Sequence, residues 1–192
     1  MMFGDAHIDE IAEKFGKPRT IALNVLLDNS EWQKLQNVMK EGTDEIILAL
    51  HPPGKQDSYF LYRDNRSPSP VLQAPCAYCN LDENIMQTVE KISKEQLGIE
   101  IVIERFLVVG YINFKNGENV IESKTLVFLA SPKNGITPKL TKPDYHYDMR
   151  LVELTQWQER IVERIHQEKY GFRHFRYVLS DLVLQETTNA HS

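Results

Sequence analysis

Apolar residues recur along this chain at two different spacings, and the two spacings alternate. Apolar positions three or four residues apart predict amphipathic helices, whereas apolar–polar alternation and short apolar runs predict strands. Helices are expected over residues 5–15, 31–41, 83–97, 156–170 and 172–185. Strands are expected over residues 20–27, 45–50, 58–63, 99–114, 119–130 and 147–154. This alternation predicts an α/β fold, an α/β/α sandwich with a mixed central sheet.

Capping and turn residues mark the ends of several of these elements. Three helix starts carry N-cap or capping-box residues, which are Asp82, the pair Ser30 and Gln33, and the pair Thr155 and Gln158. Gly98 suits the position just past the end of the helix over residues 83–97. Asn116 and Gly117 stand between the two longest strands and predict a tight hairpin.

Length and composition indicate one main domain. With 192 residues, 42% of them hydrophobic, the chain can bury one sizeable core, which we expect over residues 43–192. Residues 1–42 are expected to form an N-terminal extension, a strand plus a helix, packed on the side of that domain. The extension and the last helix add apolar faces beyond those of a minimal domain, so we also expect a homodimer.

The charge balance excludes two classes of partner. The formal net charge is −5, from 22 basic and 27 acidic residues. Nucleic acids and anionic membranes bind basic patches, so neither is an expected partner. The sequence contains no apolar run of transmembrane length and no signal-peptide core near its start, so a soluble, cytoplasmic protein is expected.

The stretch over residues 77–99 resembles the signature of the Nudix superfamily. That signature is Gly, five residues, Glu, seven residues, then Arg-Glu-hydrophobic-any-Glu-Glu-any-Gly-hydrophobic. The register fits without a gap, and the signature positions are occupied here by Ala77, Glu83, Lys91, Ile92, Glu95, Gln96, Gly98 and Ile99. The resemblance extends over residues 44–157 and implies a Nudix-like α/β/α sandwich. Of the charged and glycine positions of the signature, only Glu83, Glu95 and Gly98 are identical.

The resemblance also implies where a metal site would lie. In an α-helix, positions 92, 95 and 96 share one face, and three carboxylates there would bind Mg²⁺ or Mn²⁺ for hydrolysis of a diphosphate. This chain has Ile92 and Gln96 at two of those positions, so the metal cluster is expected to be degenerate. Glu83 and Lys91 keep the opposite-charge pair that supports the loop. Changing Ile92 and Gln96 to glutamate is expected to raise metal affinity.

Five candidate site residues follow from the resemblance. Glu95 and Glu83 are the catalytic candidates if the protein is active, and Glu95 with Gln96 are the candidate ligands of a weakly bound Mg²⁺ or Mn²⁺. Lys91, Gln96 and Arg150 are the candidate substrate-binding residues. The favoured hypothesis is a Nudix-fold protein that binds a small-molecule diphosphate of nucleoside type, or a partner protein, with little or no hydrolysis. The alternative is an active Nudix hydrolase.

A third alternative comes from Cys76 and Cys79, which form a CxxC motif. A thiol–disulfide protein would use such a pair at the start of a helix. The βαβ opening that normally precedes a redox CxxC is missing, and so are two further ligands for zinc. We therefore expect two free thiols. No Ser-His-Asp order, P-loop or HExxH motif is present, so those enzyme classes have no support.

Overall fold

The computed structural model describes residues 3–40, 42–55, 57–65, 71–141, 144, 146–167 and 171–190 of the chain. The central element is a five-stranded sheet in the order β1-β5-β6-β2-β4. Its strands are β1 (Arg19–Leu26), β2 (Glu45–Leu50), β4 (Cys76–Tyr78), β5 (Ile101–Asn116) and β6 (Asn119–Pro132). The pairs β1–β5 and β2–β6 are parallel, and β5–β6 and β2–β4 are antiparallel. The sheet is therefore mixed, as the sequence predicts.

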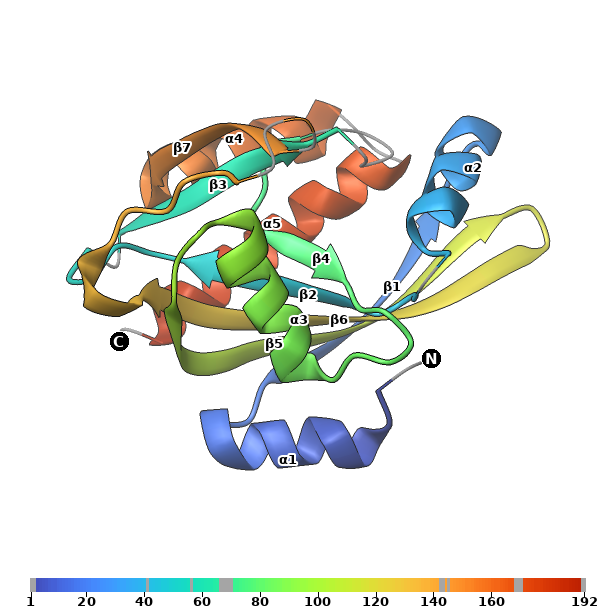
Figure 1. The fold of residues 1–192 in the computed structure, drawn as a ribbon. Helices are drawn as coiled ribbons and strands as arrows, with labels where there is room; N and C mark the ends of the chain where they lie inside the picture. The colour runs from blue at the N-terminus through green and yellow to red at the C-terminus, as the bar shows by residue number, and fades with distance from the viewer. Residues whose placement is uncertain are drawn as a thin grey trace.

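Helices cover both faces of this sheet (Figure 1). The helices are α1 (Asp5–Phe15), α2 (Asn29–Val38), α3 (Ile85–Glu90), α4 (Leu154–Gln167) and α5 (Gly171–Ala190), with the π-helix η1 (Lys91–Gln96) and the 3-10 turn η2 (Lys133–Gly135). The α3-side core, with Ile11 and Val89, lies under α1 and α3. The α5-side core lies under α2, α4 and α5 and contains Leu35, Trp157 and Phe175. The predicted α/β/α sandwich is confirmed.

The second sheet contains the strand predicted over residues 58–63 and the last predicted strand. These are β3 (Ser58–Asp64) and β7 (His146–Glu153), which pair antiparallel with each other and not with the five-stranded sheet. The two strands lie far apart from each other in the sequence. The alternation of apolar residues identifies each strand but does not indicate which strand it pairs with.

Turn chemistry determines the β5–β6 hairpin, as predicted. Asn116 pairs with Asn119 at its tip, and Gly117 has a φ of 59°, a left-handed value that glycine adopts at low cost. Together the two strands span residues 101–132, with Gly110 directly opposite Thr125 near the middle.

The three predicted helix starts are wrong in detail, two of them because another residue caps the helix. Helix α2 begins after Asp28, whose Oδ1 accepts the Glu31 backbone N–H at 2.8 Å. Helix α3 begins after Asn84, which forms a reciprocal capping box with Gln87. Helix α4 begins at Leu154, so Thr155 and Gln158 lie inside it. The predicted helix ends at residues 41 and 168–170 lie outside the described residues.

The N-terminal segment contributes to both layers of the main sandwich. β1 is an edge strand of the central sheet, α1 packs on one face and α2 on the other. The buried Asp44 carboxylate accepts the Phe3 and Lys124 backbone N–H groups, each at 2.9 Å, and so joins this segment to the start of β2. The division at residue 42 stays a prediction. Within the described residues, no helix combines the length and the apolar character that crossing a membrane requires.

Candidate functional site

The loop before α3 is organised around the carboxylate of Glu83. It accepts hydrogen bonds from the Asn80 backbone N–H (3.1 Å), the Asn80 side-chain amide (2.7 Å) and the Thr88 hydroxyl (3.1 Å). The Lys91 ammonium lies 3.2 Å from the same carboxylate, so the predicted opposite-charge pair is present. Burial alone would raise the pKa of Glu83, but the Asn80 N–H, Lys91 and Thr88 outweigh it and lower that pKa. Glu83 is therefore ionised and stabilises the loop.

The three signature positions on the helix do not share one face. Ile92 is fully buried in the α3-side core and Gln96 is 4% exposed, whereas Glu95 is exposed to solvent. The reason is the π-helical turn, in which the Leu97 N–H donates to the Ile92 carbonyl, five residues back, at 3.2 Å. Residues three apart no longer align when hydrogen bonds span five residues instead of four. The expectation of one shared face was wrong for this reason.

The amide of Gln96 is committed to interior hydrogen bonds. Its Nε2 donates to the Cys76 carbonyl at 3.3 Å, and its Oε1 accepts the Tyr62 hydroxyl at 3.3 Å. The Tyr62 oxygen in turn accepts the Cys76 backbone N–H at 3.1 Å. Gln96 therefore holds β4 in place against β3 and the helix.

These residues do not fit a divalent metal ion. Mg²⁺ and Mn²⁺ take hard oxygen ligands, which in proteins are mostly carboxylates. At the three signature positions the structure offers a buried hydrocarbon, an amide already bound within the protein, and one outward-facing carboxylate. Across the described part of the chain, no three His, Cys, Asp or Glu side chains gather as a metal site would require.

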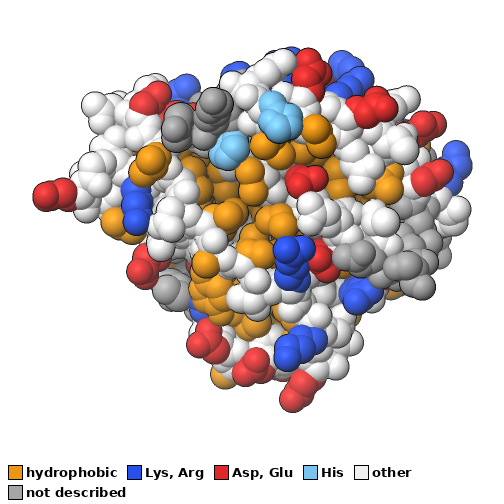
Figure 2. Space-filling model, turned by 180° about the vertical axis from the view of Figure 1, so that it is seen from behind, with side chains coloured by type: hydrophobic (Ala, Val, Ile, Leu, Met, Phe, Trp, Pro, Cys, Tyr) orange, Lys and Arg blue, Asp and Glu red, His pale blue; other side chains and the backbone are white. Residues whose placement is uncertain are grey.

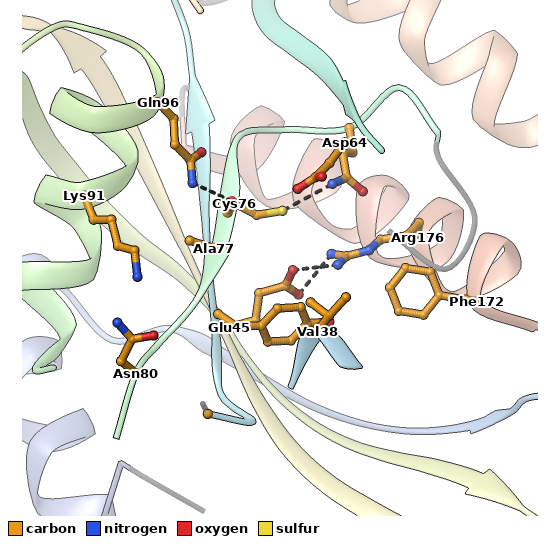
Figure 3. Close-up of a pocket in the computed structure, with 13 residues that line it drawn as sticks. Val38, Glu45, Asp64, Cys76, Ala77, Asn80, Lys91, Gln96, Phe172 and Arg176 are labelled. Atoms are coloured by element: carbon orange, nitrogen blue, oxygen red, sulfur yellow. Dashed lines mark hydrogen bonds and ion pairs between the residues drawn. The ribbon is translucent and has the colours of Figure 1, made fainter. Parts of the chain in front are cut away.

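A cavity of about 150 Å³ lies beside β4, between the helical stretch over residues 85–96 and α5 (Figure 3). The register of the β2–β4 pair determines which residues meet at the cavity, because Tyr78 of β4 lies directly opposite Glu45, the first residue of β2. Figure 3 shows Lys91 and Gln96 approaching from one helix and Phe172 and Arg176 from the other. The cavity is lined by Val38, Gly42, Glu45, Asp64, Gln73, Cys76, Ala77, Tyr78, Asn80, Lys91, Gln96, Phe172 and Arg176.

A buried ion pair forms one wall of this cavity. The Arg176 guanidinium donates two parallel hydrogen bonds to the Glu45 carboxylate, at 2.9 and 2.6 Å, and both side chains are at most 4% exposed. The rings of Phe172 and Phe175 lie 4.8 and 5.4 Å from the guanidinium carbon. Burial alone would lower the pKa of Arg176, but Glu45 outweighs it and raises that pKa, so the arginine stays charged.

Three residues of the cavity lining each carry a buried polar atom without a hydrogen-bond partner among the described residues. These atoms are the Tyr78 hydroxyl, the Arg176 Nε and the Gln73 Oε1, and each of them has almost no accessible surface. Burial, followed by the charge of Glu45, raises the pKa of Tyr78 well above its usual value, so its hydroxyl keeps its proton. Buried polar groups are nearly always paired in proteins, so these three atoms are exceptions within the packed wall of the cavity.

The structure brings two of the five candidate residues to the cavity. Lys91 and Gln96 line it, whereas Glu83, Glu95 and Arg150 are not among its lining residues. Arg150 is exposed and its Nε lies 2.6 Å from the Asp148 carboxylate, which also pairs with Arg63. The functional roles of all five residues stay predictions.

Sequence reasoning missed the residues that dominate the cavity wall. Arg176 was assigned to an amphipathic helix and Glu45 to an apolar strand. A signal was available, because Glu45 opens an otherwise apolar strand and Arg176 stands between the apolar residues Phe175 and Tyr177 on a helix rich in aromatic residues. A charged side chain at a core position needs an opposite charge, although the sequence does not indicate which one.

The two cysteines do not form an obvious redox pair. Cys76 belongs to the α5-side core and Cys79 to the α3-side core, and both are buried. Burial is the main cause that raises the pKa of both thiols, that of Cys79 to about 12. A reactive cysteine needs an exposed thiol with a lowered pKa, so this arrangement does not favour thiol–disulfide chemistry.

Comparisons with known proteins identify the fold. No protein-family model and no curated protein matches the sequence. Among solved structures, the NUDIX hydrolase from Nitrosomonas europaea is similar, with 12% identity and a TM-score of 0.52 over 78% of this chain and 89% of that one. An Ap4A hydrolase binary complex from C. elegans has 14% identity and a TM-score of 0.49, over 78% and 99% of the two chains. The MutT NUDIX hydrolase from Burkholderia pseudomallei has 19% identity and a TM-score of 0.46, over 59% and 84%. The first likeness shows that this chain has a Nudix-like fold.

Proposed function

We propose that this chain is a Nudix-fold binding module for a small-molecule diphosphate of nucleoside type, with a degenerate metal site and little or no hydrolysis. The observation that carries the proposal is the helix face over residues 92–96. Ile92 is buried in the core, the amide of Gln96 is bound to β4, and Glu95 faces solvent. That face retains the helical scaffold of the Nudix signature without a cluster of carboxylates.

The physical reason is the loss of negative charge at the metal position. A dication must be held against competing water, and this takes several oxygen ligands with negative charge. Replacing two of three carboxylates removes two formal charges. The Ile92 side chain also fills the space with hydrocarbon, so the same position cannot offer an oxygen from a bound water.

An active hydrolase is the second candidate, and a specific observation favours it. Glu83 is ionised and Glu95 is exposed, so two carboxylates remain near the helix. One or two carboxylates together with substrate phosphates are able to hold Mg²⁺. Lys91, Gln96 and Arg150 are the candidate substrate-binding residues in either case.

A phosphate-release assay separates the two candidates. The natural protein is incubated with ADP-ribose and dinucleoside polyphosphates in millimolar Mg²⁺ or Mn²⁺, with Glu95→Gln as the matched control. Cleavage of the diphosphate gives phosphomonoester products, and added alkaline phosphatase converts their terminal phosphates to the inorganic phosphate that is measured. We expect no metal-dependent release above the background, and the same result for the variant. Robust release that disappears in Glu95→Gln would establish the hydrolase and overturn the proposal.

Binding is measured separately, without metal, by the shift of the thermal midpoint. A ligand at one hundred times its dissociation constant stabilises the folded state by about 2.7 kcal/mol. We expect such stabilisation from at least one nucleoside diphosphate derivative of the panel. Absence of any shift across the panel at millimolar concentration would contradict the assignment of the ligand class.

We also propose that the protein forms a homodimer. Among the described strands, none pairs with the outer side of β1, and Leu26 on that strand is 57% exposed. Seen from behind, apolar side chains gather across the middle of the molecule (Figure 2). An open strand edge is a template for pairing with another chain. Light scattering at high concentration tests it, and the monomer mass of 22.3 kDa would contradict it.

A further inference from the structure

We propose that a second cavity, between α4, α5 and the β3–β7 sheet, binds the diphosphate group of the ligand through arginine side chains and without a metal ion. The inference rests on the proposed function, because it takes the ligand to be a small-molecule diphosphate and identifies the charges that hold it. This arginine cavity has a volume of about 490 Å³ and lies where those elements meet (Figure 1). Its lining includes five arginines, Arg63, Arg150, Arg160, Arg164 and Arg173.

Helical spacing separates the apolar floor of the arginine cavity from its charged rim. Trp157 and Ile161 lie four residues apart on α4, so they share one face, and both are buried. Arg160 and Arg164 are also four residues apart and lie on the neighbouring flank of α4, where both are exposed. Arg173, near the start of α5, is exposed as well. The guanidinium groups of the two helices are therefore accessible to a ligand from solvent.

Acidic side chains compensate only part of the positive charge at this cavity. Asp148 pairs with both arginines of the β3–β7 sheet, its carboxylate lying 3.2 Å from Arg63 Nε and 2.6 Å from Arg150 Nε. These three side chains together carry a net positive charge. Among the described lining residues one is acidic, Glu163, and its Oε1 accepts the Gln167 side-chain amide at 3.2 Å.

The helix arginines add charge that neither composition nor the Nudix resemblance explains. The net charge of the protein is −5, so five arginines around one cavity are a local concentration of the opposite sign. Arg160, Arg164 and Arg173 come after residues 44–157, the stretch that resembles Nudix proteins. Arg164 Nη1 donates to the Gln167 Oε1, a neutral amide oxygen, at 3.1 Å. Because like charges repel, an anion bound among them would be stabilised.

Diphosphate is the anion that suits these arginines. On the helix face over residues 92–96, one outward-facing carboxylate does not supply a metal site whose cation would neutralise the phosphates. A guanidinium is planar, stays charged at physiological pH and donates two parallel hydrogen bonds to phosphate oxygens. Several guanidinium groups from two helices and a sheet are able to surround two linked phosphates from different sides. They provide the positive charge that the degenerate helix face lacks.

The size of the arginine cavity favours a small molecule over a macromolecule. Its volume of about 490 Å³ lies within the range of small-ligand pockets, about 300–1,000 Å³. Nucleic acids bind through many phosphate contacts along an extended basic surface, which a protein of net charge −5 does not favour. The half-buried ring of Tyr177 also lines the cavity and offers apolar surface to the remainder of the ligand.

The experiment titrates inorganic diphosphate into the protein by calorimetry, at low ionic strength and with EDTA present. The test variant is the double change Arg160→Gln with Arg164→Gln. The matched control is Arg19→Gln with Arg105→Gln, because both of these arginines are exposed and neither lines the arginine cavity. The two variants have the same net charge, so a difference between them reports the position of the lost charges. Glutamine is a good helix former, so the test variant should keep α4.

We expect inorganic diphosphate to bind saturably to the natural protein and to be displaced by ADP-ribose. The test variant should bind diphosphate about tenfold more weakly or less, which corresponds to about 1.4 kcal/mol, and the control should bind like the natural protein. The inference is overturned if diphosphate does not bind, if the two variants bind it equally, or if ADP-ribose binds without displacing it. Tighter binding of a thymidine oligonucleotide or of polyglutamate than of diphosphate would also overturn it.

Failure of this inference is distinguishable from failure of the proposed function. If ADP-ribose raises the thermal midpoint of the natural protein and of the test variant equally, the arginine cavity is not its site and the proposed function stands. If diphosphate binding is lost in the test variant and no nucleoside derivative binds the natural protein, the cavity is an anion site and the proposed function is wrong.

Discussion

Two places on either side of β4 differ in what their polar groups do. On the helix face over residues 92–96, the groups that would meet a metal are apolar, bound within the protein or turned to solvent. In the wall of the cavity toward α5, the Glu45 carboxylate and the Arg176 guanidinium are buried and matched in charge. The comparison indicates that the retained spacing of the motif predicts the helix and the loop before it, and not the metal ligands. The buried pair of charges lies on Glu45 and Arg176, which the motif does not include.

The helix face over residues 92–96 is tested by restoring a carboxylate there with Ile92→Glu, which has the largest expected effect. Because Ile92 is fully buried in the α3-side core, we expect a loss of about 5 kcal/mol or more in the free energy of unfolding, measured with urea. This replaces the expectation of raised metal affinity. Ile92→Val is the volume control and should cost about 0.5–1.5 kcal/mol. A stable Ile92→Glu protein that binds Mg²⁺ would show that this face is still a metal site.

The cavity is tested by breaking its ion pair with Arg176→Met. Removing one member of a buried pair leaves the charge of Glu45 unpaired, so we expect a loss of about 3–5 kcal/mol in denaturant unfolding. The double change Arg176→Met with Glu45→Met should be less destabilised than the single one.

Arg19→Met serves as its control. Arg19 pairs with Glu186 at 3.1 Å but is 46% exposed, so its removal should cost less than about 1 kcal/mol. Equal effects of Arg176→Met and Arg19→Met would contradict the description of a buried, matched pair.

The smallest of these effects concerns the stabilisation of the loop before α3 by Glu83, which depends on pH. Since the pKa of Glu83 is lowered in the folded protein, its stabilisation is present above the unfolded value of about 4.3 and is lost as the pH falls through the folded pKa. Glu83→Gln should therefore destabilise by about 1–2 kcal/mol at pH 7, and this difference should vanish at acidic pH. Glu118→Gln, in the exposed β5–β6 turn, should change little at either pH. A difference that did not decrease as the pH fell would contradict the assignment.

The sequence predicts most of the fold and less of the site, for identifiable physical reasons. Local signals sufficed for the β5–β6 hairpin at Gly117 and for the apolar stripe of Ile85, Val89 and Ile92. The π-turn over residues 91–96 was not predictable, because apolar spacing alone does not distinguish hydrogen bonds spanning four residues from those spanning five. Nor was the Glu45–Arg176 pair, since its members lie at opposite ends of the domain sequence and only tertiary packing brings them together.

The parallel pairing of β1 with β5 has a consequence for how the chain acquires its structure. Arg19 pairs with Val108, about ninety residues further along, and β1 has β5 as its one neighbour in the described sheet. Closing so long a loop costs entropy before any contact compensates it, and such pairings form slowly. During synthesis, residues 19–26 leave the ribosome long before their partner does. The apolar segment must stay unpaired for that interval, so early self-association of nascent chains is the hazard that this topology carries.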